Sequence, residues 1–238
     1  AKQTVQWMAA QYREAGIRGV EIQRFSQDLD SPFWLPLRWE MRLIAKPAFG
    51  QQSRDIVLET AMPLAPSEIP NGPLRGTLVY VGRGSLAEIA QIDVRGKIAV
   101  QQITPQAHMV FERDNAVPNA QAMFDRGAIA VINIVDLPGN ERARDFSNCG
   151  GPCFNLGGQD GHFLSSVFNK AAENGTSSEL EMALELETET FVGLSAENGI
   201  AVLPGSDSSE NFVINAHIDA WFDGAGDNAD GMAVQLAL

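Results

Sequence analysis

Phe212-Val213-Ile214-Asn215-Ala216-His217-Ile218-Asp219 is the stretch around which the chain is organised. Its apolar residues would occupy both faces of an extended segment, as in the centre of a parallel or mixed sheet, so we predict a buried strand over 212–218. A glycine-containing loop follows, and Asp227 then opens a segment that reads as an amphipathic helix. The apolar residues of that segment at helical spacing are Ala229, Met232, Ala233, Leu236 and Ala237.

His217, Asp219 and Asp227 are the candidate site residues of this stretch. In an extended chain the side chains at positions i and i+2 point to the same side, so Asp219 can hydrogen-bond one imidazole nitrogen of His217 and fix its tautomer for metal binding. Asp227 can act as a helix N-cap or as a metal ligand. A lone His-x-Asp is usually only a polar pair and an Asp before a helix is usually only a cap, but their combination is far less common. Because sites in open α/β sheets form beyond the carboxyl ends of strands, we predict a metal site here.

The composition is that of a globular protein with an acidic balance. The 238 residues are enough for one large domain or two smaller ones, and the formal net charge is −13. This charge opposes binding to nucleic acids and to anionic membrane surfaces, because both attract basic patches. No apolar run approaches the roughly 20 residues that span a bilayer. The first residues contain no signal-peptide core, and since the sequence does not begin with Met we expect a processed or trimmed product.

The chain before residue 212 reads as helices alternating with strands. Apolar spacing predicts a helix over 3–15, and period-two alternation predicts half-buried strands over 20–25 and 37–43. Together these elements suggest the outer part of an α/β sheet. Five prolines then cluster between residues 46 and 73, which indicates loops, edge strands and a domain boundary nearby. Further predicted strands cover 77–81, 97–100, 128–135, 180–187 and 198–203, and further predicted helices cover 119–126 and 161–174. This alternation predicts an α/β fold.

The two cysteines, Cys149 and Cys153, enclose Gly-Gly-Pro. Their spacing differs from the two-residue gap of redox and zinc-knuckle motifs. Two cysteines alone exclude a disulfide scaffold and a cysteine-only structural zinc site. Two interpretations stay open: a local disulfide in an oxidising compartment, and two unpaired cysteines beside a turn.

The stretch that begins at His217 resembles the first metal-binding segment of the co-catalytic zinc aminopeptidase and glutamate carboxypeptidase family. The resemblance rests on His217-Ile218-Asp219 and on Gly224-Ala225-Gly226-Asp227-Asn228-Ala229-Asp230-Gly231, and Trp221 is similar to the carboxypeptidase-type branch. Residues 198–205 are similar to the strand before this motif. The segments that resemble the protease-associated domain inserted in this family are 94–100, 127–131 and 152–158.

By this resemblance, His217 would ligate one of two zinc ions, Asp227 would bridge both, and Asp219 would orient His217. The ions would activate a water for attack on a peptide carbonyl. The implied fold is part of a zinc-exopeptidase mixed-sheet α/β domain with an inserted β-rich protease-associated domain. The implied domains are the first part of the peptidase domain at 1–50, the insert at 51–190 and the resumed, incomplete peptidase domain at 191–238.

The same family requires a downstream pair of acidic residues, a further carboxylate and a final His, and no residue after Leu238 supplies them. We therefore expect this chain to be the N-terminal portion of such an enzyme, inactive by itself and weak in zinc binding. His108 and His162 fall in the inserted region, and we interpret them as structural or surface residues.

Three classes of function stay open from the sequence. The favoured one is a zinc-dependent exopeptidase, with an aminopeptidase ahead of a carboxypeptidase or dipeptidase. The second is a non-catalytic protease-associated module that binds peptides or proteins, and the third is a structural α/β domain. We expect a peptide substrate and no nucleic-acid partner, and leave a homo-oligomer open. The resemblance favours a secreted, periplasmic or cell-envelope location.

Overall fold

The computed structural model describes residues 2–30, 32–44, 54–83, 86–104, 113–142, 149–207, 209–219 and 225–237, with the side chains of 113–117, 226 and 227 excepted. The chain forms two compact units. The first combines Ala1–Phe33 with Phe191–Leu238, and the second is Trp34–Thr190. The second unit is therefore inserted, in sequence, between the two parts of the first.

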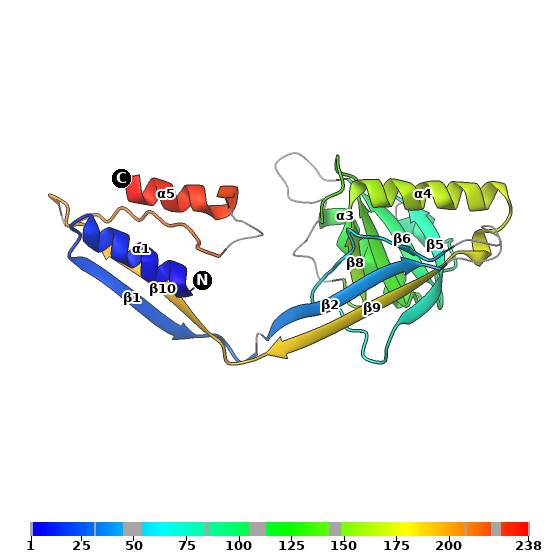
Figure 1. Ribbon diagram of the computed structural model, residues 1–238, viewed down its shortest axis with the longest axis horizontal. Helices are drawn as coiled ribbons and strands as arrows, with labels where there is room; N and C mark the ends of the chain where they lie inside the picture. Colours follow the sequence, from blue (N-terminus) through cyan, green and yellow to red (C-terminus); the bar gives the residue numbers. More distant parts are fainter. Residues whose placement is uncertain are drawn as a thin grey trace. The chain divides into compact units, whose positions relative to one another are not determined.

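The first unit is built on a two-stranded antiparallel sheet (Figure 1). Its elements are α1 (Lys2–Glu14), β1 (Gly19–Ser26), β10 (Ser195–Val202), the π-helical turn η3 (Ala225–Ala229) and α5 (Asp230–Ala237). Gly19 lies opposite Val202 and Ser26 opposite Ser195. Helix α1 packs on these strands and buries Val5, Met8 and Ala9, the apolar face that the sequence pattern predicts.

The second unit contains an eight-stranded mixed sheet in the order β3-β2-β9-β5-β6-β7-β8-β4. Strands β5 to β8 run parallel in this order, whereas β9 and β4 pair antiparallel with β5 and β8. The strands are β2 (Phe33–Leu43), β3 (Ile56–Val57), β4 (Met62–Pro63), β5 (Leu74–Gly82), β6 (Ile98–Ile103), β7 (Ala130–Val135), β8 (Cys153–Leu156) and β9 (Glu181–Phe191). The helices are α2 (Leu86–Ile89), α3 (Arg113–Asp125), α4 (Gly158–Glu173) and the short η2 (Ser177–Glu179).

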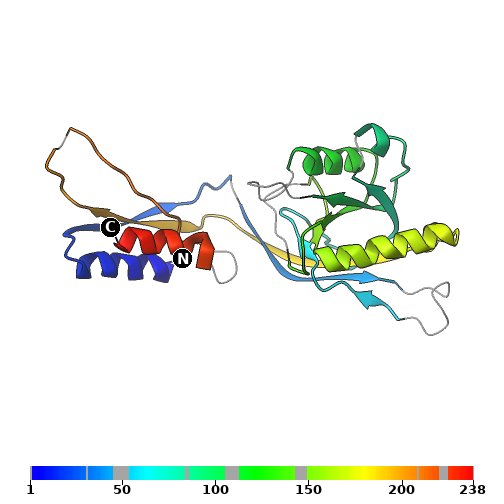
Figure 2. The same ribbon diagram turned by 90° about the horizontal axis from the view of Figure 1, so that it is seen from above.

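Helices cover both faces of the parallel strands, as Figure 2 shows. In β7, Ile132 and Ile134 belong to the apolar cluster that includes Leu164 of α4. Val131, which directly precedes Ile132 in the strand, belongs to a second cluster that includes Met123 of α3. Because successive side chains of a strand point to opposite faces, α4 and α3 lie on opposite sides of the sheet. The residues of β6 and β7 are therefore packed on both faces of the sheet, as is typical of parallel strands covered by helices on either side.

A ladder of buried amide side chains crosses three of these strands. Gln101, Asn133 and Asn155 are neighbours in the register of β6, β7 and β8. Gln101 Nε2 donates to Asn133 Oδ1 at 2.8 Å, and Asn133 Nδ2 donates to Asn155 Oδ1 at 3.0 Å. All three residues are buried, so their polar atoms depend on one another rather than on solvent.

The structure confirms the predicted α/β class but separates two strands that the sequence placed together. The strands predicted at 20–25 and 37–43 were expected to share the outer part of one sheet. Instead β1 pairs with β10, while β2 lies between β3 and β9 in the other sheet. The compact units divide at Phe33–Trp34 and at Thr190–Phe191, and the predicted insert spans 51–190. The assignment of the units to a peptidase and a protease-associated domain stays a prediction.

Cys149 and Cys153 form a disulfide, with their Cα atoms 6.0 Å apart. Both residues are buried in the cluster under α3. The hydroxyl of Ser67 accepts the backbone N–H of Cys153 at 2.9 Å, which ties this segment to the loop after β4. The structure therefore selects the bonded alternative of the two that the sequence left open.

We predict that the native chain carries no free thiol. Alkylation under denaturing, non-reducing conditions should leave the intact mass unchanged, whereas prior reduction should add two alkyl groups. Replacing Cys149 and Cys153 together by Ser should lower the free energy of unfolding by about 2 kcal/mol, since the bridge closes only a short loop. Two alkylated cysteines in the unreduced protein would contradict the bond.

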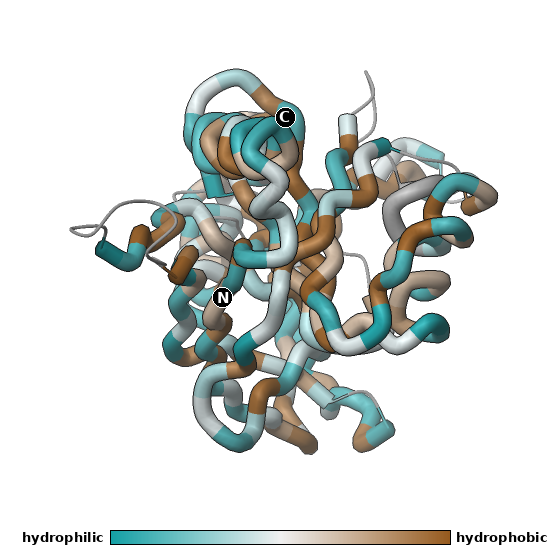
Figure 3. Tube along the Cα trace, turned by 90° about the vertical axis from the view of Figure 1, so that its right-hand side faces the viewer, coloured by the Kyte–Doolittle hydropathy of each residue, from teal (hydrophilic) through white to brown (hydrophobic). Residues whose placement is uncertain are grey.

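None of the described helices is long and apolar enough to cross a membrane. In Figure 3 apolar and polar residues are interspersed along the trace.

Candidate metal-binding site

The segment that carries the candidate ligands is extended but is not a strand. Residues 211–219 adopt neither helix nor strand, and the Phe212 and Val213 side chains are 90% and 80% exposed. The prediction of a buried central strand over 212–218 is therefore wrong. A strand requires a neighbour that satisfies its backbone hydrogen bonds, and within the described ranges the sheet of the first unit contains only β1 and β10.

His217 and Asp219 do interact as the sequence predicts. Nδ1 of His217 lies 3.0 Å from the backbone oxygen of Asp219 and 3.2 Å from its Oδ1. Both Asp219 atoms are acceptors when the carboxylate is ionised, so the imidazole proton is assigned to Nδ1 and the lone pair to Nε2. This is the tautomer in which a histidine coordinates a metal through Nε2.

The start of the last helix is held against this segment. Asn228 Nδ2 donates to the His217 carbonyl at 3.3 Å, and Gln235 Nε2 donates to the Ile214 carbonyl at the same distance. A Cβ on Gly231 would lie 2.2 Å from Asn228 Oδ1, so a larger residue there would displace the Asn228 side chain from this position. The helix predicted after Asp227 is confirmed as α5, although none of its residues is buried. These contacts place Asn228, the residue after Asp227, against the backbone of His217.

Helix α5 is also tied to α1 of the same unit. The hydroxyl of Tyr12 donates to Gln235 Oε1 at 2.9 Å. Partial burial of this phenol raises the pKa of Tyr12 above its usual value, so the hydroxyl stays protonated and able to donate at neutral pH. Gln235 therefore joins α1, α5 and the 211–219 segment.

Asp227 itself is placed only by its backbone, which belongs to η3. Its side chain lies outside the described residues, as does His108. Among the side chains that are described, no three from His, Cys, Asp and Glu are close enough together to hold a metal ion. The described residues that remain are His217 and Asp219, an imidazole and the carboxylate beside its Nδ1. Neutral imidazole is a good zinc ligand when its second nitrogen is hydrogen-bonded, so this pair has the chemistry that zinc requires. Turns of π-helix are frequent at functional sites, and η3 is such a turn.

A second polar cluster lies at the carboxyl ends of the parallel strands. Asp160 in the first turn of α4 accepts hydrogen bonds from the backbone and hydroxyl of Thr60, at 2.9 and 2.8 Å, and from Asn140 Nδ2 at 3.1 Å. Because protein donors occupy both oxygens of the Asp160 carboxylate, we interpret Asp160 as a structural residue that joins α4 to the segments at Thr60 and Asn140. Sequence analysis missed it because Thr60 lies 100 positions away.

His162 lies on the surface of α4, with its side chain 69% exposed and its Nε2 3.5 Å from Asp136 Oδ1. This agrees with its interpretation as a surface residue. Asp136 also forms an ion pair with Arg83. Exposed pairs of this kind contribute little to stability, and we assign the three residues no chemistry.

The fold defines the class of this protein. It is a mixed-sheet α/β structure with a second unit inserted between β1 and β10. No protein-family model and no curated protein matches the sequence. Solved structures do match. An aminopeptidase from Aneurinibacillus sp. strain AM-1 aligns with a TM-score of 0.63 and 22% identity, over 98% of this chain and 51% of its own.

Two further solved structures agree with this comparison. A peptidase M28 precursor from Shewanella amazonensis SB2B aligns with a TM-score of 0.65 and 19% identity, over 97% of this chain and 51% of its own. A zinc aminopeptidase from Bacillus subtilis aligns with a TM-score of 0.61 and 22% identity, over 99% of this chain and 50% of its own. The resemblance to zinc aminopeptidases is thus confirmed for the fold, and the chain spans about half the length of these proteins.

Proposed function

We propose that this chain forms part of a zinc-dependent exopeptidase, with an aminopeptidase favoured over a carboxypeptidase or dipeptidase. The observation that carries the proposal is the hydrogen bond from His217 Nδ1 to Asp219, at a point where Asn228 holds the His217 backbone. The likeness of the fold to aminopeptidases, one of them a zinc enzyme by its description, supports the same conclusion.

In this proposal His217 and Asp227 are metal ligands, and Asp219 is a positioning residue. Asp219 keeps the imidazole proton on Nδ1, so that Nε2 presents its lone pair. Asn228, next to Asp227 within η3, holds this turn against the His217 carbonyl. Two zinc ions, when bound, would supply Lewis acidity that makes a water nucleophilic at neutral pH. The proposed substrate is a peptide.

We also propose that Trp34–Thr190 is the inserted protease-associated domain. The chain leaves the first unit after β1 and returns to it at β10, and these two strands pair with each other. Within the inserted unit, the first and last strands, β2 and β9, are neighbours in the eight-stranded sheet. An insert whose two ends lie in neighbouring strands can be accommodated without disturbing the host sheet.

The disulfide supports a proposed location outside the reducing cytoplasm. Structural disulfides persist in secreted, periplasmic and cell-surface proteins, where thiols are not kept reduced. Cys149–Cys153 is such a bond, buried in the core of the inserted unit.

Substitutions at the candidate ligands should change zinc binding selectively. Asp219→Asn should weaken zinc affinity about 10–100-fold, the usual effect of removing a carboxylate that orients a histidine ligand. His217→Ala should weaken it further, because a ligand itself is lost. The measurement is competitive titration of the metal-free 238-residue chain with zinc against a chromophoric chelator.

His162→Ala is the matched control, since this exposed histidine lies in the other unit and should leave zinc affinity unchanged. Equal zinc affinity in the His217→Ala variant and the parent chain would refute the proposed site. Circular dichroism on each variant would separate a lost ligand from a lost fold.

A further inference from the structure

The inserted unit contains a cavity of about 590 Å³ whose lining is mixed in chemistry. Its apolar part comes from Ile69 and Leu186, which are both largely buried, together with two prolines of the loop before β5. A cavity of this size is typical of sites that hold a small molecule or a few residues of a peptide. Arg38 of β2 and residues 185–188 of β9 form the remaining wall.

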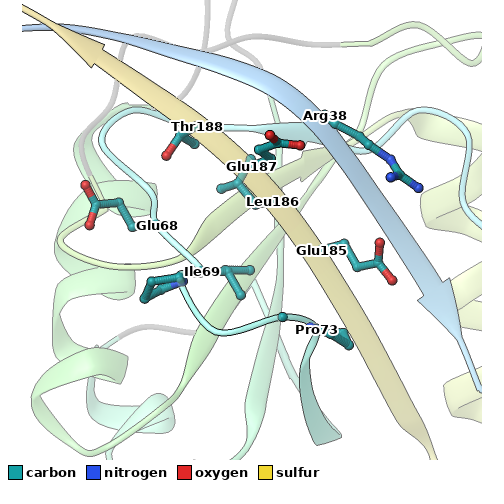
Figure 4. Close-up of a pocket in the computed structure, with 10 residues that line it drawn as sticks. Arg38, Glu68, Ile69, Pro73, Glu185, Leu186, Glu187 and Thr188 are labelled. Carbon is teal, nitrogen blue, oxygen red and sulfur yellow. The ribbon is translucent and has the colours of Figure 1, made fainter.

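Charged side chains surround this apolar floor on different elements. Figure 4 shows Glu68 on the loop at one side of the view, Arg38 and Glu185 at the other, and Glu187 beside Thr188 on β9. Glu68 and Glu187 are exposed and form no ion pair with any residue in the described part of the chain. The lining thus offers three carboxylates against one guanidinium, in a chain whose net charge is already −13.

These carboxylates do not form a metal cage. No three acidic, histidine or cysteine side chains among the described residues are close enough to share one cation. Carboxylates spread around an apolar floor suit a longer cation instead. Lysine and arginine bury their aliphatic stems on apolar surface while their charged ends reach polar groups. Arg38 could then donate to a carbonyl oxygen of the same ligand, because a guanidinium is a donor only.

We propose that this cavity binds a peptide segment through a lysine or arginine side chain flanked by apolar residues. The stem and the apolar neighbours lie on Ile69 and Leu186, and the cationic end reaches the carboxylates of the lining, of which Glu68 and Glu187 are exposed. The cavity shares no residue with the proposed zinc centre, since every lining residue belongs to Trp34–Thr190. It therefore does not rest on the proposed peptidase activity.

The test uses the full 238-residue chain and two peptides with blocked ends, acetyl-Ala-Leu-Lys-Leu-Ala-amide and its counterpart with Glu in place of Lys. Blocked ends remove the free terminus that an exopeptidase recognises, so binding here does not depend on the zinc site. Nitrogen-15 NMR titration gives both affinity and location. We expect the Lys peptide to shift the amides of residues 68, 69, 71, 72 and 185–188, and the Glu peptide to leave them unshifted.

Replacing Glu68 and Glu187 together by Gln should weaken the Lys peptide about tenfold, the effect of losing two exposed ion pairs. Glu189→Gln, a substitution on the same strand outside the cavity, should leave affinity unchanged. Added salt should weaken binding to the parent chain more than to the double variant. Equal shifts from both peptides, shifts that map elsewhere, or no binding of the Lys peptide at millimolar concentration would each overturn the proposal.

Discussion

Replacing Asn133 by Leu is expected to destabilise the inserted unit by about 3 kcal/mol, although the two side chains are similar in size. Asn133 is the middle member of the buried amide ladder, where it accepts from Gln101 and donates to Asn155. The substitution removes both bonds and leaves polar atoms in the sheet interior without the partners they have now. A buried donor or acceptor that loses its partner costs the free energy of its desolvation.

The measurement is equilibrium unfolding in denaturant, followed by tryptophan fluorescence. Trp34 and Trp39 lie in the inserted unit and report on it. Asn169→Leu provides the matched control, because Asn169 is exposed on α4 and the same exchange there should change stability by less than about 0.5 kcal/mol. An Asn133→Leu variant as stable as the Asn169→Leu variant would show that the ladder contributes nothing.

Replacing Phe154 by Ala should have a still larger effect, a loss of about 4 kcal/mol. Phe154 is fully buried in β8, opposite Ile132 of β7, within the cluster that α4 covers. Truncation removes apolar contacts from both the sheet and the helix and leaves a cavity that rigid strands fill poorly.

Phe163→Ala is the control for this change. Phe163 lies on α4 with 39% of its surface exposed, so the same truncation there should cost much less. The two variants are compared by the same denaturant midpoint and slope as above. If they shift the midpoint equally, the cluster between β8 and α4 is not the stabilising core of the inserted unit.

The parts of the fold that the sequence predicted share a local cause. Strands β6 and β7 were found because short apolar runs next to turns are typical of strands buried on both faces. The contact between His217 and Asp219 was found because a separation of two residues in an extended chain brings the side chains together, whether or not the segment joins a sheet.

The parts that sequence analysis missed depend on distant partners. Phe212 to Ile218 have the pattern of a central strand, but the pattern does not say which strand would pair with them, and the described residues contain none. The bonds between Asp160 and Thr60 and between Gln101 and Asn133 join segments that no local pattern relates. The cavity beside Arg38 likewise combines a loop with β2 and β9, two strands that lie at opposite ends of the sequence of the inserted unit.

The pairing of β1 with β10 also has a consequence for the order of folding. Arg24 and Glu197 face each other across these strands, yet they are 173 positions apart in the sequence. Closing so long a flexible loop costs entropy, whereas an insert that has already folded holds its own ends in the neighbouring strands β2 and β9. Reducing the effective loop to a few tens of residues lowers this cost by about 2 kcal/mol. The inserted unit therefore acts as an internal scaffold, and the small sheet that leads into the candidate zinc ligands gains stability once that scaffold has formed.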